Sequence, residues 1–436
     1  MLIVTVLSQV VAVAESGDQE GAAGRDLSRV SPLVGNDFRI SGPGATSDEW
    51  DPAVAYNPTN HRYLVVWSDD RNEGSRGTDI YGQLLAADGT RIGGDFRISG
   101  PAATSYEYDP AVAYNPASNQ YLVVWRDRRN DATRGWDIYG RRVKATGNLA
   151  GGDFRISGPA ATDDESDPTV AYNSAGNQYL VVWYDERDYA TRGYDIYGRR
   201  VKATGKPAGG DFRISGPAAT DNEFGPVVAY SSASNQYLVV WQDERSDATR
   251  GDDIYGRRVK ATGKPAGGDF RISGNAATSD EYSPAVAYNS ANNQYLVVWT
   301  DNRNGATRGT DIYGRRVKAT GKPAGGDFRI SGNAATSNDF EPAVAYNYPA
   351  SNQYLVVWRD WRNGVTRGYD IYGRRVKATG NLAGGDFRIS GAAATLNEFG
   401  PVVAYNPTNH QYLVAWNDWR NDATRGNDIY GRRVTG

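Results

Sequence analysis

The sequence predicts an all-β fold, a seven-bladed β-propeller with four antiparallel strands in each blade. An apolar run, Tyr-Leu-Val-Val-Trp in six copies and Tyr-Leu-Val-Ala-Trp in the seventh, ends in Trp67, Trp125, Trp183, Trp241, Trp299, Trp358 and Trp416. Successive Trp residues lie 58 positions apart in five cases and 59 in one, and a fixed period of this length indicates a repeat architecture. Each period holds four short strand-like runs separated by turn residues, which is typical of a propeller blade.

The four runs of a copy differ in their apolar pattern. The Asp-Phe-Arg-Ile-Ser run (residues 95–99 in one copy) and the Asp-Ile-Tyr-Gly-Arg-Arg-Val run (137–143) alternate apolar residues with Arg, as expected of strands near a solvated rim. The run that begins at a Pro (110–114) and the Trp run (121–125) are apolar on both alternations, which predicts burial on both faces. We therefore place the Trp residues between blades. An open β-solenoid is the alternative, but its rungs of roughly 20 residues are much shorter than this period.

The two ends of the repeat array complement each other. The first Asp-Phe-Arg-Ile-Ser run begins at Asp37, and the chain ends after residues 428–434, one strand short of a full blade. With the Pro run innermost, we expect residues 37–41 to become the outermost strand of the last blade and to close the ring. The propeller then spans residues 37–436.

The N-terminal segment has a different composition. Residues 2–14 are apolar and end in Ala-Val-Ala, like the apolar region and cleavage site of a secretory signal peptide, although a positive start is missing. We expect residues 1–14 to be a leader or an N-terminal strand, and residues 15–36 a polar tail, in a secreted, extracellular or cell-surface protein. Thirteen residues are too few for a membrane-spanning helix. If retained, the run could pair with a neighbouring molecule and form a homopolymer through residues 1–36.

Composition excludes several classes of function. The formal charge is −3, which gives no electrostatic reason to expect a nucleic-acid partner. The chain has no Cys and only two His, His61 and His410, so thiol chemistry and a His-based metal site are not predicted. We assign no cofactor.

Charged residues recur beside every Trp. The first copy has Asp69 and Arg71, two and four residues after its Trp, and Asp79 opens the next run. A catalytic site is needed once, so we interpret these sets as structural: the Asp closes a turn and the Arg pairs with a carboxylate. A calcium site in each loop is the alternative, because calcium prefers oxygen ligands.

A further carboxylate lies three residues before each repeated Pro. The set is Glu49, Glu107, Glu165, Glu223, Glu281, Asp339 and Glu398. Either these residues form a cation-attracting ring at the channel mouth, or they pair with the repeated Arg residues. We favour pairing, because seven unpaired carboxylates would repel one another.

Differences between copies indicate a binding surface. The loop after the Trp run and the loop before the Pro run vary most, and strand order places both on one face. All four Trp residues outside the repeated set fall in these loops, and exposed aromatic residues are typical of binding surfaces. The predicted ligand-binding residues are Trp50, Trp136, Trp361, Trp419, Tyr194, Tyr369, Arg126 and Arg359. Packing over the blade edges is the alternative role for the aromatic residues.

The repeat itself resembles known sequences. The pattern Trp-x-Asp-x-Arg-Asn…Asp-Ile-Tyr-Gly-Arg-Arg-Val…Gly-Gly-Asp-Phe-Arg-Ile-Ser, as in residues 125–157, is similar to repeats of secreted bacterial and archaeal proteins. Those proteins resemble TolB-like and sialidase-like propellers in strand order. The resemblance covers residues 37–436 and implies the fold. No copy has the sialidase Asp-box, Ser/Thr-x-Asp-x-Gly-x-Thr-Trp, so the resemblance does not imply sialidase activity.

These observations favour a non-enzymatic extracellular binding or structural propeller, for example a cell-surface or filament-forming subunit. Its partner would be a protein or a glycan on the variable face. One alternative is a multivalent carbohydrate-binding lectin, and the other is a glycan-cleaving enzyme. No blade departs from the others with a unique acid pair, so we predict no catalytic residue and no bound metal.

Overall fold

A computed structural model describes residues 31–436 of the chain. The leader predicted at residues 1–14 lies outside this range, and so does the polar tail up to residue 30. The homopolymer contact predicted through residues 1–36 therefore lies mostly outside the described residues and stays a prediction.

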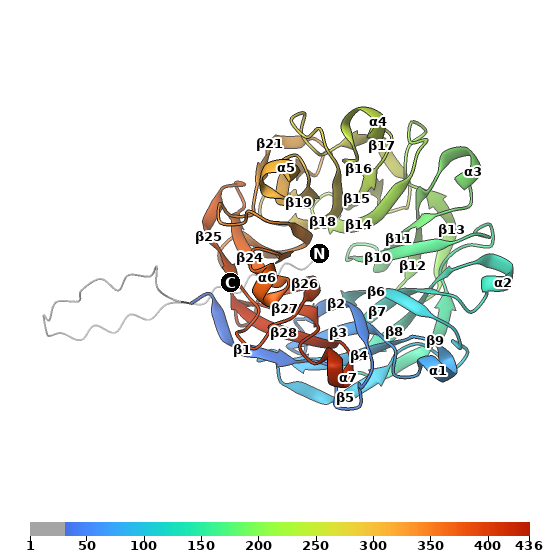
Figure 1. The fold of residues 1–436 in the computed structure, drawn as a ribbon. Helices are drawn as coiled ribbons and strands as arrows, with labels where there is room; N and C mark the ends of the chain where they lie inside the picture. The colour runs from blue at the N-terminus through green and yellow to red at the C-terminus, as the bar shows by residue number, and fades with distance from the viewer. Residues whose placement is uncertain (1–30) are drawn as a thin grey trace, which may run out of the picture. The chain divides into compact units, whose positions relative to one another are not determined.

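Residues 33–436 form a ring of seven four-stranded antiparallel sheets, which confirms the predicted seven-bladed propeller (Figure 1). The inner strands are β2 (Glu49–Asn57), β6 (Glu107–Asn115), β10 (Glu165–Asn173), β14 (Glu223–Ser231), β18 (Glu281–Asn289), β22 (Asp339–Asn347) and β26 (Glu398–Asn406). The second strands are β3 (Arg62–Asp69), β7 (Gln120–Asp127), β11 (Gln178–Asp185), β15 (Gln236–Asp243), β19 (Gln294–Asp301), β23 (Gln353–Asp360) and β27 (Gln411–Asp418). We number the blades 1 to 7 from the sheet that contains β2.

The outer half of each blade follows the same order. The third strands are β4 (Asp79–Ala86), β8 (Asp137–Lys144), β12 (Asp195–Lys202), β16 (Asp253–Lys260), β20 (Asp311–Lys318), β24 (Asp370–Lys377) and β28 (Asp428–Thr435). The outer strands are β5 (Arg91–Arg97), β9 (Leu149–Arg155), β13 (Pro207–Arg213), β17 (Pro265–Arg271), β21 (Pro323–Arg329), β25 (Leu382–Arg388) and, for blade 7, β1 (Leu33–Arg39). The strand predicted from Asp37 thus begins four residues earlier.

Strand register separates two faces of the ring. In blade 1 Glu49 pairs with Asp69, and Asp69 pairs with Asp79, so the variable loops leave the sheet on the same side. We call this side the loop face, and the opposite side, with the short β2–β3 and β4–β5 turns and their counterparts, the turn face. The loops after the second strands contain one-turn helices that the sequence did not predict: α1 (Glu73–Arg76), α2 (Asp131–Arg134), α3 (Tyr189–Arg192), α4 (Asp247–Arg250), α5 (Gly305–Arg308), α6 (Gly364–Arg367) and α7 (Asp422–Arg425).

The hydrophobic core lies between blades, as the doubly apolar runs predict. Leu64 and Val66 of blade 1 pack against Tyr121, Val123 and Trp125 of blade 2, and all five are fully buried. The seven repeated Trp residues have no exposed surface. Each blade therefore stabilises both of its neighbours, and an interrupted ring would expose two apolar faces.

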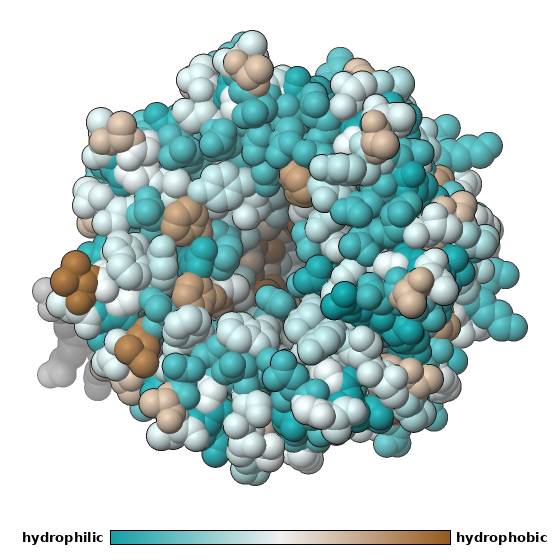
Figure 2. All heavy atoms as spheres, turned by 45° about the vertical axis from the view of Figure 1, so that its right-hand side comes forward, coloured by the Kyte–Doolittle hydropathy of each residue, from teal (hydrophilic) through white to brown (hydrophobic). Residues whose placement is uncertain are grey.

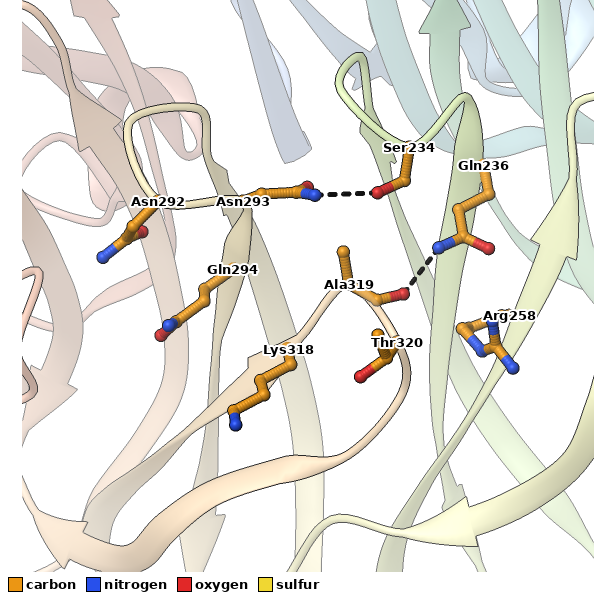
Figure 3. Close-up of a pocket in the computed structure, with 9 residues that line it drawn as sticks. All are labelled: Ser234, Gln236, Arg258, Asn292, Asn293, Gln294, Lys318, Ala319 and Thr320. Atoms are coloured by element: carbon orange, nitrogen blue, oxygen red, sulfur yellow. Dashed lines mark hydrogen bonds between the residues drawn. The ribbon is translucent and has the colours of Figure 1, made fainter.

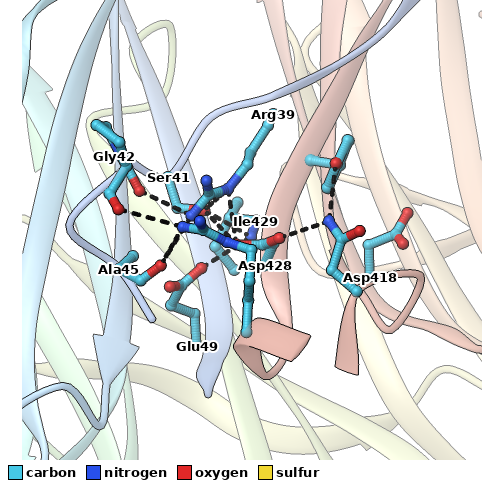
Figure 4. A network of polar contacts seen from close by, with 12 residues as sticks. Arg39, Ser41, Gly42, Ala45, Glu49, Asp418, Asp428 and Ile429 are labelled. Carbon is cyan, nitrogen blue, oxygen red and sulfur yellow. Dashed lines mark hydrogen bonds and ion pairs between the residues drawn. The ribbon is translucent and has the colours of Figure 1, made fainter. Parts of the chain in front are cut away.

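The ring closes between the two ends of the array, as predicted. Strand β1 pairs antiparallel with β28, with Phe38 opposite Gly431 and Arg39 opposite Tyr430. The Arg39 guanidinium lies 2.6 Å from the buried carboxylate of Asp428 and also donates to the carbonyl oxygens of Gly42 and Ala45 (Figure 4). Polar contacts of this kind tie residues near the start of the ring to its last strand.

Candidate functional site

A cavity of about 430 Å³ lies on the axis of the propeller. Figure 2 shows the ring hollowed at its centre, with apolar residues inside the hollow. Seven Pro residues, one from each inner strand, form an apolar collar: Pro52, Pro110, Pro168, Pro226, Pro284, Pro342 and Pro401. The residue before each Pro also lines the cavity, and this position differs between blades: Asp51, Asp109, Asp167, Gly225, Ser283, Glu341 and Gly400.

A β-bulge brings these residues to the axis. The pairing of the inner and second strands shifts in register around each of them, as between Trp50 and Ala53 in blade 1. Asp51, Asp109 and Asp167 have φ values of 51°, 55° and 51°, in the left-handed region that side chains other than Gly rarely adopt. Strained backbone of this kind is concentrated at functional sites. Four of the seven positions nevertheless carry a carboxylate.

The carboxyl groups of Asp51, Asp109 and Asp167 form one cluster. Asp51 and Asp167 lie within hydrogen-bonding reach of Asp109. Enclosure in the channel, followed by the nearby charge of Asp109, raises the pKa of Asp51 and of Asp167 to about 7. Water in the cavity still reaches the exposed Asp51 side chain, which weakens the effect relative to full burial. The cluster thus retains protons near neutral pH.

Arg126 holds the central carboxyl of this cluster. Its Nε lies 2.6 Å from Oδ2 of Asp109, and its guanidinium lies over the rings of Tyr108 and Trp136, 5.5 and 4.8 Å from their centroids. Burial raises the pKa of Asp109, and the positive charge of Arg126 opposes this shift. The ion pair thus favours the charged form, which can accept hydrogen bonds from protonated Asp51 and Asp167. The predicted ligand-binding residue Arg126 is therefore part of the axial site.

Blade 6 carries a second Arg–carboxylate pair on the far side of the ring. Arg359 NH2 lies 3.0 Å from Oε1 of Glu341, whose Oε2 accepts a hydrogen bond of 3.0 Å from the backbone N–H of Gly400. The Arg359 guanidinium lies 4.8 Å from the ring centroid of Tyr369 and 5.0 Å from that of Phe399. In a seven-membered ring, blade 6 faces the junction of blades 2 and 3, so Glu341 lies across the cavity from Asp109 and Asp167.

The predicted aromatic residues lie at the loop-face ends of the blades and in the adjoining loops. Trp50, Trp136, Trp361 and Trp419 are each half-buried, as are Tyr194 and Tyr369. Trp361 packs on Tyr369 at 4.5 Å between centroids, and Trp419 packs on Phe399 at 5.1 Å. Tyr194 contacts Phe224 at 5.1 Å. Their role in ligand binding stays a prediction, but all six lie on the predicted face.

Sequence reasoning missed the four axial carboxylates Asp51, Asp109, Asp167 and Glu341. The residue three positions before each Pro hardly varies, so at that position no blade carries an acid pair that the others lack. The signal was one position before the Pro, where four copies carry an acid and three carry Gly or Ser. The bulge that turns this position into the channel is not visible in the apolar pattern.

The carboxylates found three residues before each repeated Pro do not line the axial cavity. Both roles considered for them, a cation-attracting ring and pairing with the repeated Arg residues, are wrong. Glu49, Glu107, Glu165, Glu223, Glu281, Asp339 and Glu398 are all completely buried. They neither face the channel mouth nor form ion pairs with the repeated Arg residues of the described chain, which bind other carboxylates. Burial, reinforced by the charge of Asp127, raises the pKa of Glu107 to about 9. Burial likewise raises the pKa of the other six members, so the protonated form is favoured in all seven.

We expect this buried ring to make stability depend on pH. The pKa of Glu107 is 4.5 in the unfolded chain and about 9 in the folded one, so its favourable contribution is complete below about pH 4.5 and is lost as pH rises through about 9. Melting temperatures of wild type should therefore fall across this range. Glu107→Gln should show a shallower fall, while Glu73→Gln, at an exposed position, should match wild type. Equal pH dependence of Tm in all three proteins would contradict the assignment.

The repeated Asp–Arg sets have the predicted structural role. Asp69 accepts hydrogen bonds from Trp67 Nε1 at 2.9 Å and from the backbone N–H of Arg71 at 3.0 Å. Arg71 NH2 bridges Asp69 and Asp95, at 2.6 Å each, and its guanidinium lies 3.9 Å from the Tyr81 ring centroid. These contacts tie the loop after the second strand to the outer strand.

Calcium in each loop remains a prediction. Within residues 31–436, one group of three acids has a geometry that a cation could use: Asp247, Asp252 and Asp280, with carboxylate oxygens within 4.8 Å of one another. Gln242 donates a hydrogen bond of 2.7 Å to Asp252. Because equivalent positions in other blades differ, this cluster is not a repeated loop site.

Comparisons with known proteins concern the fold. No family model matches the chain, and no curated protein is similar to it in sequence. An α-L-arabinofuranosidase from Fusarium graminearum, bound to an iminosugar inhibitor, shares 12% identity over 80% of this chain and 98% of its own, with a TM-score of 0.50. The polysaccharide lyase Uly1 shares 10% identity over 88% of this chain and 90% of its own, with a TM-score of 0.53.

These likenesses show a common propeller fold, and they correct the predicted function. The similar propellers are enzymes that act on glycans, so the prediction of a non-enzymatic binding or structural protein is wrong. The predicted absence of enzymatic activity is corrected on the same ground. The propeller fold that the resemblance implies is confirmed, while the TolB-like resemblance stays a prediction. No helix within residues 31–436 has the length and apolarity to cross a membrane.

Proposed function

We propose that residues 33–436 form a glycan-cleaving enzyme that hydrolyses a glycosidic bond in the axial cavity. The observation that carries the proposal is the set of four carboxyl groups that only some blades supply, placed on strained backbone around one hollow. Glycoside hydrolysis generally needs two carboxyl groups in different protonation states on opposite sides of the scissile bond. The propeller enzymes of similar fold support this direction.

The two sides of the cavity have different roles in this proposal. Asp51 and Asp167 keep protons near neutral pH, which suits a general acid that protonates the leaving glycosidic oxygen. Glu341, held by Arg359 and the Gly400 N–H, presents an anion to the opposite side of the sugar. As the bond breaks, this carboxylate takes a proton from the attacking water, or itself attacks the anomeric carbon.

The loop face supplies the binding surface for the glycan. Aromatic rings on this face offer apolar surfaces to sugar rings at low cost in side-chain entropy. A cavity of about 430 Å³ is within the size range of small-molecule sites. We place the protein outside the cell, where polysaccharide substrates are found, in agreement with the predicted leader.

The direct test is incubation of the full chain with a panel of neutral and acidic polysaccharides. We expect new reducing ends without unsaturated sugars, as hydrolysis requires. Unsaturated ends would instead indicate a lyase and overturn the hydrolytic mechanism. Binding without any cleavage would indicate a lectin and overturn the proposal as a whole.

A further inference from the structure

Every lysine of the chain lies on the turn face of the propeller. The eight residues lie at the ends of the third strands of blades 2 to 6 or in the turns that follow them: Lys144, Lys202, Lys206, Lys260, Lys264, Lys318, Lys322 and Lys377. All eight are exposed. The loop face has no lysine and the turn face has all eight, so the lysines add positive charge to the turn face alone.

No acidic residue offsets this charge within the same turns. In blades 2 to 6, neither the turns between inner and second strands nor those between third and outer strands contain Asp or Glu. The ion pairs of residues 31–436 are all formed by arginines, so none of the lysines is paired. The protein as a whole has a formal charge of −3, so the positive charge is local to this face.

A polar pocket of about 300 Å³ lies on this face between blades 4 and 5. Its wall combines two cations, Arg258 and Lys318, with the amides of Asn292 and Gln294 and the hydroxyl of Thr320 (Figure 3). The Asn293 amide donates a hydrogen bond of 2.8 Å to Ser234 Oγ, and this contact fixes the shape of the pocket rim. Cations next to amides and hydroxyls can contact both an anionic group and neutral hydroxyl groups of one ligand.

The same residue types recur at neighbouring blade junctions. Arg142 and Lys202 take the places of Arg258 and Lys318 between blades 2 and 3, Arg200 and Lys260 between blades 3 and 4, and Arg316 and Lys377 between blades 5 and 6. Blades 1 and 7 have no lysine, so the series is an arc and not a full ring. Four equivalent Arg–Lys pairs along an arc, one of them lining the pocket between blades 4 and 5, suit a repeating polymer, because each additional contact is made within an already formed complex.

We propose that this lysine arc binds an acidic polysaccharide, a chain of sugars that carries carboxylate or sulfate groups. The surface lies on the face opposite to the loop face, and the proposal therefore goes beyond the axial site. The amides distinguish this partner from other polyanions. Sugar hydroxyls both donate and accept hydrogen bonds, as Asn and Gln amides do, whereas the phosphodiesters of DNA only accept.

The test measures binding of the full chain to polygalacturonate and to dextran sulfate, with neutral dextran as the uncharged control. Glu341→Gln protein is used throughout, so that cleavage in the axial cavity does not consume the probe. We expect salt-sensitive binding to at least one acidic polymer and none to dextran. The triple variant Lys202→Gln, Lys260→Gln, Lys318→Gln should bind at least tenfold more weakly. The matched variant with Arg at the same three positions should retain binding, because it retains the charge.

Three results would overturn the inference. The first is equal affinity of the triple Gln variant and the Glu341→Gln parent. The second is tighter binding to duplex DNA, and the third is tighter binding to phosphatidylserine vesicles, than to either acidic polysaccharide. These outcomes are separate from the fate of the proposed function, which is decided by cleavage of glycans by the wild-type chain.

Discussion

Replacing Glu341 by Gln is expected to lower glycan turnover by about 10²–10⁴-fold, the usual contribution of a positioned acid–base group. Gln keeps the size of the side chain but removes the negative charge that faces the sugar. It also breaks the ion pair with Arg359, 3.0 Å away. Initial rates on whichever glycan the wild-type chain cleaves give the measurement.

The protonated carboxyl groups of Asp51 and Asp167 should leave a different signature in the pH profile. Replacing Asp51 and Asp167 together by Asn removes the carboxyl groups whose pKa is raised to about 7. We expect a similar loss of rate and, in the residual activity, the loss of the decline that wild type shows as pH rises through about 7. Asp163→Asn, at an exposed position of the loop face, serves as the control. Full activity of either cavity variant would exclude the proposed roles.

Removal of the closing strand is expected to have the largest effect on stability. A chain that begins after residue 42 lacks the ion pair of Asp37 with Arg420 and that of Arg39 with the fully buried Asp428. It also lacks Ile40, which is completely buried. Loss of one partner of a buried ion pair typically costs about 3–5 kcal/mol, and loss of a buried Ile side chain about 2–5 kcal/mol.

We therefore expect this truncated chain to melt far below wild type, or to fail to fold. A chain that lacks only residues 1–30 is the matched control, because it keeps all of β1. Thermal unfolding followed by circular dichroism compares the three proteins. Similar melting temperatures for the two truncated chains would show that β1 does not hold the ring closed.

The fold could be predicted because it depends on features that every copy repeats. Apolar runs around each Trp require burial on two faces, and the missing strand at one end matches the extra strand at the other. Even the roles of Asp69 and Arg71 followed from their repetition. The one-turn helices were missed because four polar residues have no apolar periodicity, and residues 33–36 were missed because the repeated motif begins only at Asp37.

The site was only half predictable. Arg126 and Arg359 were identified because they vary between copies, and both contact axial carboxylates. Asp51, Asp109 and Asp167 vary in the same way, but their direction depends on a bulge that the sequence pattern does not reveal. The raised pKa of Glu107 could not be predicted from the sequence either, because it is set by burial between blades and not by neighbouring residues in the sequence.

The uniform bulge before each Pro makes the seven axial positions interchangeable. Gly225 and Gly400 adopt the same left-handed backbone, with φ values of 51° and 54°, as the acidic residues of other blades. An acidic side chain could therefore be moved from one blade to the next without rebuilding the backbone. Such transplants would change the positions of the proposed catalytic groups around the axis while the surrounding loops stay fixed. Substrate selection and bond cleavage could then be varied independently within one architecture.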